Sequence, residues 1–215
     1  MQLLKSLSPA IVMLMPISVF AACTLGNEVQ KPTYYSYLIQ QSNPTPKLVP
    51  IPAKWIIIPG ISAGQTHINE NMIAVLKRLG KPDYGDAAMG KSMSIWYAGH
   101  NSTNYETAIV ASRYTLGTED TASLVQEILV TSPKFRLQNG IHTGVSHQQV
   151  ATKYKLAKAA TLGKSRHRLT VYRTSKGIDF EFNAAGTCTG IYIHAIKYQS
   201  NVAYLAFHPE LERTK

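Results

Sequence analysis

Two stretches of this sequence, "KWIIIPGISAGQTH" at residues 54–67 and "KFRLQNGIHTGVSH" at residues 134–147, align without a gap. Lys, Gly, Ile, Gly and His coincide, and the aromatic, aliphatic and hydroxyl positions agree in kind. A match of this quality at one fixed offset indicates an internal repeat. The first residues of each copy alternate as a strand does, and the glycines permit turns that other residues disfavour. Thr66 and Ser146 then stand where a helix N-cap is expected.

The same order of predicted elements follows each copy. Apolar residues recur at helical spacing over residues 68–79 and, more weakly, over residues 150–157. Three strand-like runs come next, "SMSIWYA", "TAIVASRY" and "SLVQEILVT" in the first copy, and "RLTVYRT", "GIDFEFN" and "CTGIYIHAI" in the second. The alternation in "GIDFEFN" places Phe180 opposite Asp179 and Glu181, which is typical of an antiparallel sheet with one covered face.

These patterns predict the α+β class, with two tandem repeats, each a short helical segment packed on an antiparallel β-meander, and the two sheets side by side. We divide the chain into a signal peptide (1–22), a Pro-rich tether (23–53), repeat 1 (54–132), repeat 2 (133–200) and a C-terminal tail (201–215). The prolines of the tether exclude a continuous helix and favour extended chain.

The first residues of the chain predict export. Lys5 precedes an apolar run over residues 7–20, and the small residues Ala21 and Ala22 follow, as in a secretory signal peptide. Cleavage after Ala21 gives a soluble mature chain. If the junction is instead a lipobox, Cys23 is acylated and the mature protein is a lipoprotein. We expect a periplasmic or outer-membrane-anchored protein and keep both cleavage sites open.

The segment "GISAG" also matches the G-x-S-x-G turn of serine hydrolases, with Ser62 as the candidate nucleophile. The second copy has His142 at the equivalent position, and the single strand before Gly60 is too little for an α/β-hydrolase sheet. We therefore expect no catalytic residue, and a small exported esterase that uses Ser62 remains the alternative. The spacing of His67, His147 and the remaining histidines and cysteines matches no zinc pattern, so neither a metal nor a cofactor is predicted.

The net charge of +10 is concentrated in one region, because residues 131–178 contain no Asp or Glu. The predicted anion-binding residues in this region are Lys153, Lys155, Lys158, Lys164, Arg166, Arg168 and Arg173. Such a surface attracts the phosphates of lipopolysaccharide, anionic lipid headgroups or an acidic protein. A merely solvated basic face is the alternative, and no nucleic-acid-binding motif is present.

A second candidate site is the predicted outer face of the sheet. Aligning the copies sets Tyr97 beside Tyr172, opposite the expected core residues Trp96 and Val171. With the neighbouring strands, the predicted partner-binding residues are Tyr97, Glu127, Leu129, Tyr172, Asp179, Glu181, Tyr192 and His194. Exposed aromatic clusters are typical of interface anchors, so we expect a protein partner in the cell envelope. The alternative is that the tether folds back over this face.

The unit G-I-x-x-G-x-[ST], a helix, "LGKPD" at residues 79–83 and a meander resembles the outer-membrane lipoproteins of the SmpA/OmlA type. Two such units in tandem resemble the β-lactamase inhibitory proteins, and the resemblance covers about residues 54–197. It implies a joined, curved sheet, with a role in outer-membrane assembly for the first family and enzyme inhibition through the sheet for the second. The second copy departs from the pattern, since it has "KLAKA" for L-G-x-P, and Cys188 is the only cysteine of the repeats. Together these features predict an exported, non-catalytic binding or scaffold protein.

Overall fold

The structure is a computed structural model that describes residues 50–116, 120–164, 167–197, 207–208 and 211–213. The expected signal peptide, Cys23, nearly all of the tether and Arg166 lie outside the described residues. None of the helices within these ranges is long and apolar enough to cross a membrane.

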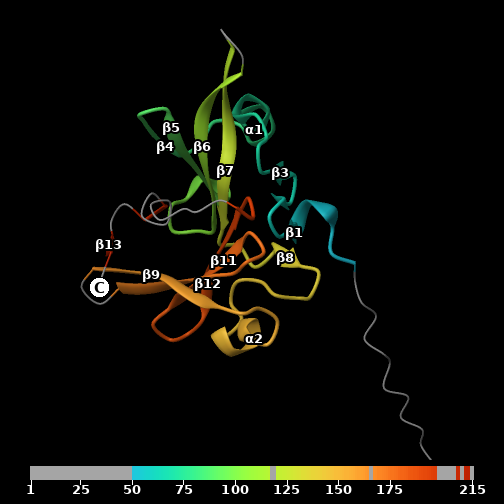
Figure 1. Cartoon of the computed structure of the whole chain (residues 1–215), viewed down its shortest axis with the longest axis vertical. Helices are drawn as coiled ribbons and strands as arrows, with labels where there is room; N and C mark the ends of the chain where they lie inside the picture. Colours follow the sequence, from blue (N-terminus) through green and yellow to red (C-terminus); the bar gives the residue numbers. More distant parts are fainter. Residues whose placement is uncertain (1–49, 117–119, 165–166, 198–206, 209–210, 214–215) are drawn as a thin grey trace, which may run out of the picture. The chain divides into compact units, whose positions relative to one another are not determined.

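The largest unit of the described residues is one antiparallel sheet of nine strands (Figure 1). In order across the sheet, the strands are β13 (Glu212–Arg213), β9 (Ala157–Lys164), β10 (His167–Arg173), β11 (Ile178–Asn183), β12 (Cys188–His194), β7 (Asp120–Val130), β6 (Glu106–Leu116), β5 (Lys91–Tyr97) and β4 (Tyr84–Ala88). The strands β4 to β7 and β9 to β12 are two consecutive meanders, and the pairing of β12 with β7 joins them.

A second, smaller sheet brings the two glycine-containing copies side by side. It consists of β3 (Thr66–His67), β2 (Ser62–Ala63), β1 (Ile56–Ile58) and β8 (Arg136–Leu137), in that order. Strand β1 runs parallel to β8, with Ile57 beside Leu137. Gly64 has a φ of 57°, and a Cβ at this position would lie 2.3 Å from the carbonyl oxygen of Lys54. Only glycine therefore fits this turn.

The first α-helix, α1 (Met72–Leu79), begins later than the sequence predicts. Its N-cap is Asn71, whose side chain accepts a hydrogen bond from the Ile73 N–H at 2.9 Å. Thr66, the predicted cap, is buried in β3, so the turn between Thr66 and the helix is longer than in the second copy. The helix ends at Gly80, as predicted. Two 3-10 turns, η1 (Ala53–Trp55) and η2 (Ala98–His100), complete the helical segments of the described ranges.

The second helix, α2 (His147–Ala151), has the predicted cap and an unexpected end. The Ser146 side chain accepts the Gln149 N–H, and the Gln149 side chain accepts the Ser146 N–H, which completes a capping box. The apolar stripe over residues 150–157 predicts a longer helix. The chain instead turns after Ala151, and the following residues pair with β10 as strand β9.

The predicted α+β class is wrong, because strands make up 51% of the structure and the described residues contain only two short helices. The two-residue strands β2, β3 and β13 were not predicted from the sequence, and nor were two longer strands, β4 and β9, with the sequences YGDAA and AKAATLGK. Neither is rich in the β-branched and aromatic residues that mark strands. Each lies next to a strongly patterned strand, β5 or β10, and pairing with that strand outweighs its own weak propensity.

Both faces of the large sheet carry a hydrophobic core. The helix face packs against the two helices and the small sheet; it includes Trp96, Ile128, Phe180, Ile191, Val75 of α1 and Val150 of α2. The tail face packs against residues near the C-terminus; it includes Ile95, Leu129, Val171, Tyr192, Phe207 and Leu211. We keep these two names, because the candidate sites lie on opposite faces.

Candidate functional site

The predicted partner-binding surface is buried. The alternation along β11 and β12 is confirmed, since Phe180 and Ile191 lie on the helix face and Tyr192 lies on the tail face. The expectation that the tail face is exposed is wrong. Six of the eight predicted side chains are buried there: Glu127, Leu129, Asp179, Glu181, Tyr192 and His194.

Residues near the C-terminus cover this face. Phe207 and Leu211 belong to the same hydrophobic cluster as Tyr192, and the rings of Tyr192 and Phe207 lie 5.6 Å apart. Strand β13 adds itself to the edge strand β9. The sequence offers a signal for this packing, because "AFHPEL" at residues 206–211 is too apolar for a solvated tail. The tether, which was the alternative cover for this face, lies almost wholly outside the described residues.

The two tyrosines expected at the centre of the surface lie on opposite faces. Tyr97 packs against the tail-face cluster, whereas Tyr172 packs against the helix-face cluster together with Trp96. Val171, expected beside Trp96, lies on the tail face. The alignment of the copies was therefore displaced by one residue, and a displacement of one residue moves every side chain of a strand to the other face.

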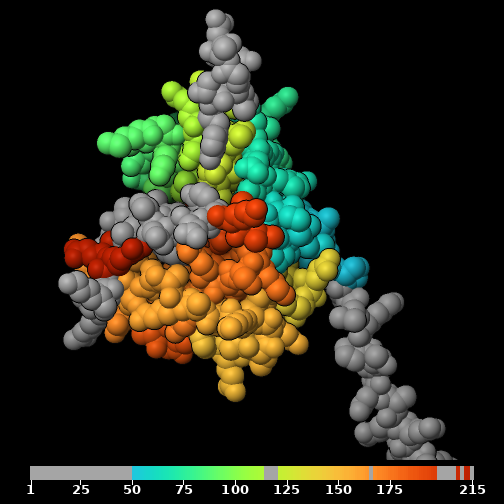
Figure 2. All heavy atoms as spheres, in the orientation of Figure 1, coloured from blue at the N-terminus to red at the C-terminus, as the bar shows by residue number. Residues whose placement is uncertain are grey.

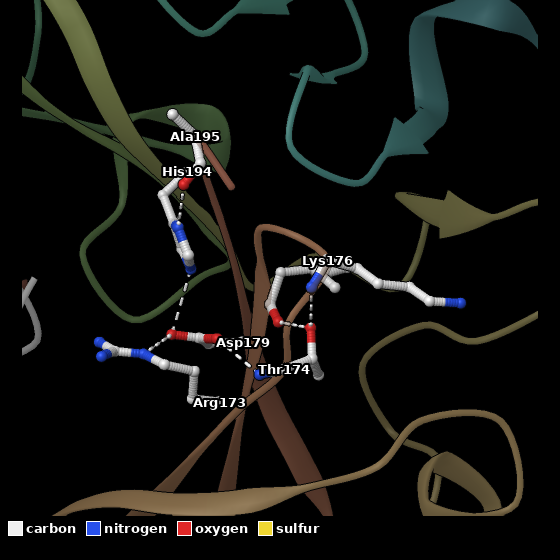
Figure 3. A network of polar contacts seen from close by, with 7 residues as sticks. Arg173, Thr174, Lys176, Asp179, His194 and Ala195 are labelled. Carbon is white, nitrogen blue, oxygen red and sulfur yellow. Dashed lines mark hydrogen bonds and ion pairs between the residues drawn. The ribbon is translucent and has the colours of Figure 1, made fainter. Parts of the chain in front are cut away.

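A network of polar contacts surrounds Asp179 on the tail face (Figure 3). One carboxylate oxygen lies 3.4 Å from Nε of Arg173 and 3.3 Å from Nε2 of His194, and the other accepts the Thr174 N–H at 3.1 Å. Arg173 stands directly opposite Asp179 in the pairing of β10 with β11. Arg173 was predicted to bind an external anion, but the structure pairs it with this internal carboxylate.

The environment of His194 favours its charged form. Burial alone would lower the pKa of the imidazole, but the hydrogen bond and charge of Asp179 outweigh it, helped by the Ala195 carbonyl and the charge of Glu127, and raise the pKa above its ordinary value. Nδ1 of His194 lies 2.9 Å from the Ala195 carbonyl oxygen. An imidazolium carries a proton on both nitrogens, and each nitrogen lies close to an acceptor oxygen, Nε2 to the Asp179 carboxylate and Nδ1 to the Ala195 carbonyl, so the geometry agrees with the direction of the pKa.

A second carboxylate on the tail face, Glu181, connects the sheet to the C-terminal residues. Its oxygens accept hydrogen bonds from the hydroxyls of Thr189 and Tyr192, each at 2.6 Å, and Nε2 of His208 also lies at 2.6 Å. Burial favours the neutral acid, but the contacts with His208, Thr189 and Tyr192 hold the pKa of Glu181 below its usual range. A side chain in place of Gly190 would crowd Leu129 and this carboxylate.

These buried charges have a structural role. Each carboxylate is surrounded by donors from the same sheet or from the C-terminal residues, and it is closed to solvent. Cys188 is also buried, and burial together with the charge of Glu181 raises the pKa of its thiol, which disfavours the thiolate. The described residues contain no group of three His, Cys, Asp or Glu side chains arranged to hold a metal ion.

The structure does not form a nucleophile elbow at Ser62. That motif requires a strand, a sharp turn and a helix, with the serine exposed on the turn. Ser62 is buried within β2, and β3 rather than a helix follows it. The alternative of an esterase that uses Ser62 therefore has no support from this geometry.

The predicted basic surface of the second repeat is exposed. Its described members are Lys153, Lys155, Lys158, Lys164 and Arg168. Within the described residues, none of these five cations has a carboxylate within 4.0 Å. The nearest acidic residues along the chain, Asp179 and Glu181, point to the tail face and are already paired. We call the five cations the basic surface.

A groove opens beside the basic surface, on the helix face. Its volume is about 360 Å³, and it is lined by His147, Arg168, Thr170, Tyr172, Phe182, Asn183, Ala184 and Gly186. The rings of His147 and Tyr172 lie 4.8 Å apart, and those of His147 and Phe182 lie 4.9 Å apart, both edge to face. Lys158 stands opposite Tyr172 in the pairing of β9 with β10. The cations are visible in the sequence, but the groove is not, because its lining comes from α2, β10, β11 and the turn after β11 together.

Comparison of the chain with protein-family models, with curated proteins and with solved structures gave no match, so the structure supports assignment to no family.

Proposed function

We propose that this protein is exported and, without catalysis, binds an anionic component of the cell envelope through its basic surface. One observation carries the proposal: the second repeat has five exposed cations, and within the described residues no carboxylate pairs with them. Residues 147–164 and 167–170, gold to orange in Figure 2, form a broad part of the surface in that view. An unpaired basic surface attracts phosphate-bearing lipids and glycolipids.

The tail face is not proposed as a binding site for a protein. Its aromatic and acidic side chains are buried beneath Phe207 and Leu211, so a partner would first have to displace them. The basic surface needs no such change, because its side chains already face solvent.

The test is binding of the exported protein to phosphatidylglycerol vesicles and to lipopolysaccharide, with phosphatidylcholine vesicles for comparison. Every arm carries Cys23→Ser, so that an acyl chain cannot contribute. We expect binding to the two anionic surfaces only, falling as salt is raised, because the Debye length shortens from about 10 Å at 0.1 M to about 3 Å at 1 M. Absence of binding at low salt would overturn the proposal.

A matched pair of variants separates this surface from net charge. Lys153→Gln, Lys155→Gln and Lys158→Gln together remove three charges from the basic surface; Lys77→Gln, Lys81→Gln and Lys91→Gln remove three exposed charges from the first repeat. A lysine near an anionic membrane contributes about 1 kcal/mol, so the first variant loses about a hundredfold in affinity. The variant of the first repeat should lose much less affinity for the vesicles, because its lysines lie outside the basic surface. Equal losses would contradict a specific surface.

We also propose that Cys23 anchors the protein, on the basis of the Ala-Ala-Cys junction after the apolar run. The protein then partitions into detergent and carries an acyl mass at its N-terminus, and Cys23→Ser releases it. An unmodified N-terminal peptide that begins at Ala22 would show the soluble form instead.

A further inference from the structure

We propose that the groove beside the basic surface binds a phosphorylated sugar, an inference that rests on the proposed function and names the ligand class of that surface. The groove combines a guanidinium at Arg168, a hydroxyl at Thr170 and an aromatic ring at Tyr172. These three residues alternate along β10, so the same strand presents all of them on the helix face.

Charge supports an anionic ligand. Arg168 is exposed and has no carboxylate partner among the described residues. A guanidinium can hold two oxygens of a phosphate at once, which a lysine cannot do. Lys158 adds a second positive charge from the neighbouring strand, because it faces Tyr172 in register. The carboxylates of β11 lie on the tail face and are paired there, so they do not neutralise the groove at close range.

The size and the lining of the groove require more than a bare phosphate. A volume of about 360 Å³ lies at the lower end of the range of small-molecule sites, about 300–1,000 Å³, and is more than a bare phosphate requires. The half-buried ring of Tyr172 provides apolar surface for a sugar ring, and Thr170 and Asn183 provide polar groups for hydroxyls. An apolar wall with a few polar groups is the usual composition of a small-molecule site.

One buried nitrogen also favours a ligand that carries hydroxyl groups. His147 lines the groove, and its Nε2 is buried without a hydrogen-bond partner in the described part of the chain. A buried polar atom without a partner costs about 1–3 kcal/mol. If the His147 ring rotates to expose this nitrogen to the groove, a ligand hydroxyl would remove that cost, whereas a lipid acyl chain would not.

The test is an NMR titration of the exported protein with glucose 1-phosphate, with glucose and inorganic phosphate in separate arms. We expect shifts confined to the groove, and binding of the sugar phosphate at least about ten times tighter than binding of either part alone. Inorganic phosphate that binds equally well would show a phosphate site without a sugar site and overturn the inference. Absence of groove shifts with all three probes would overturn it as well.

The variants replace exposed residues, so a loss of sugar-phosphate binding can be separated from a loss of folding. Arg168→Lys retains the charge and loses the two-pronged contact, so we expect it to weaken binding of the sugar phosphate about tenfold. Arg168→Gln, which removes the charge as well, should weaken binding further, whereas the matched control Arg113→Gln removes an exposed arginine charge from β6, outside the groove, and leaves binding nearly unchanged. Equal losses in Arg168→Gln and Arg113→Gln would reduce the site to general electrostatics and contradict the inference.

The vesicle experiment tests the proposed function and the NMR titration tests the phosphosugar inference, so one proposal can be overturned while the other stands. Vesicle binding without groove shifts leaves the proposed function intact and removes the phosphosugar inference. Groove shifts without vesicle binding retain the site and remove the proposed envelope surface. Tyr172→Leu provides a last check on the ring contact, with its melting temperature measured alongside; loss of sugar-phosphate binding at an unchanged melting temperature supports the inference, and unchanged binding contradicts it.

Discussion

On the tail face of β10 and β11 the charged side chains are buried and paired, whereas on the helix face of the same region they are exposed and unpaired. Asp179 and Glu181 are surrounded by Arg173, His194 and His208. On the helix face of β9 and β10, Lys158 and Arg168 face solvent. The comparison separates two uses of charge, because buried pairs determine how the sheet packs and exposed cations remain free to bind.

Glu181→Ala tests the buried side and carries the largest expected effect. It removes the acceptor of Thr189 and Tyr192 and leaves His208 without its carboxylate, and breaking a buried pair costs about 3–5 kcal/mol. The measurement is the free energy of unfolding in urea at pH 7. Glu212→Ala, at an exposed position of β13, is the control and should stay within about 0.5 kcal/mol of the parent. A loss below about 1 kcal/mol in Glu181→Ala would mean that the pairing does not hold the C-terminal residues.

His194→Gln gives the next largest effect, and that effect depends on pH. A hydrogen bond to a charged group contributes about 1.5–3 kcal/mol. The pKa of His194 is raised in the folded protein, so its stabilisation is fully present below the unfolded value of 6.5 and is lost as the pH rises through the higher folded pKa. The stability difference between the parent and His194→Gln is therefore larger at pH 6 than at pH 9, measured by urea unfolding.

The groups that face His194 fix the sign of this prediction. Asp179 and Glu127 favour the imidazolium, and Arg173 is held by the same Asp179 carboxylate. Glu181 does not titrate in this interval, because its lowered folded pKa places its stability loss at pH values falling below 4.5. A difference that grows between pH 6 and pH 9 would show that His194 is neutral when folded.

Ser146→Ala tests the helix face, with a smaller expected loss of stability. The substitution removes one half of the capping box of α2, and loss of such a cap costs about 1 kcal/mol. Because His147 is the first residue of α2 and lines the groove, we expect altered NMR shifts at Tyr172 and unchanged pH dependence from His194. A change in that pH dependence would show that the two faces are coupled.

The sequence predicted the repeat, the cap of α2 and the alternation of β11 and β12, because each depends on neighbouring residues. It failed where distant residues decide. The weak strands β4 and β9 form because β5 and β10 offer them edges. Periodicity separates the two faces of a strand, but it does not say whether another segment covers one of them, and the packing of Phe207 and Leu211 buried the predicted partner surface.

The site residues divide in the same way. Exposure of the five cations followed from the absence of acidic residues nearby in the sequence, whereas the pairing of Arg173 required the register of β10 against β11. The groove depends on α2, β10 and β11 together, so no single motif could reveal it.

The smallest expected effect concerns the exposed side of the comparison. Replacing Lys153, Lys155 and Lys158 by Gln removes like charges that repel one another and breaks no contact with a carboxylate among the described residues. Surface substitutions of this kind stay within about 0.5 kcal/mol, and relief of repulsion makes the sign stabilising at low salt. At 1 M salt screening removes the gain. The cost of Glu181→Ala, in contrast, should hardly change with salt, because a buried pair is poorly screened. Urea unfolding of both variants at low and high salt measures the contrast, and a loss of more than about 1 kcal/mol in the lysine variant would show that these cations hold the fold together rather than remain free to bind.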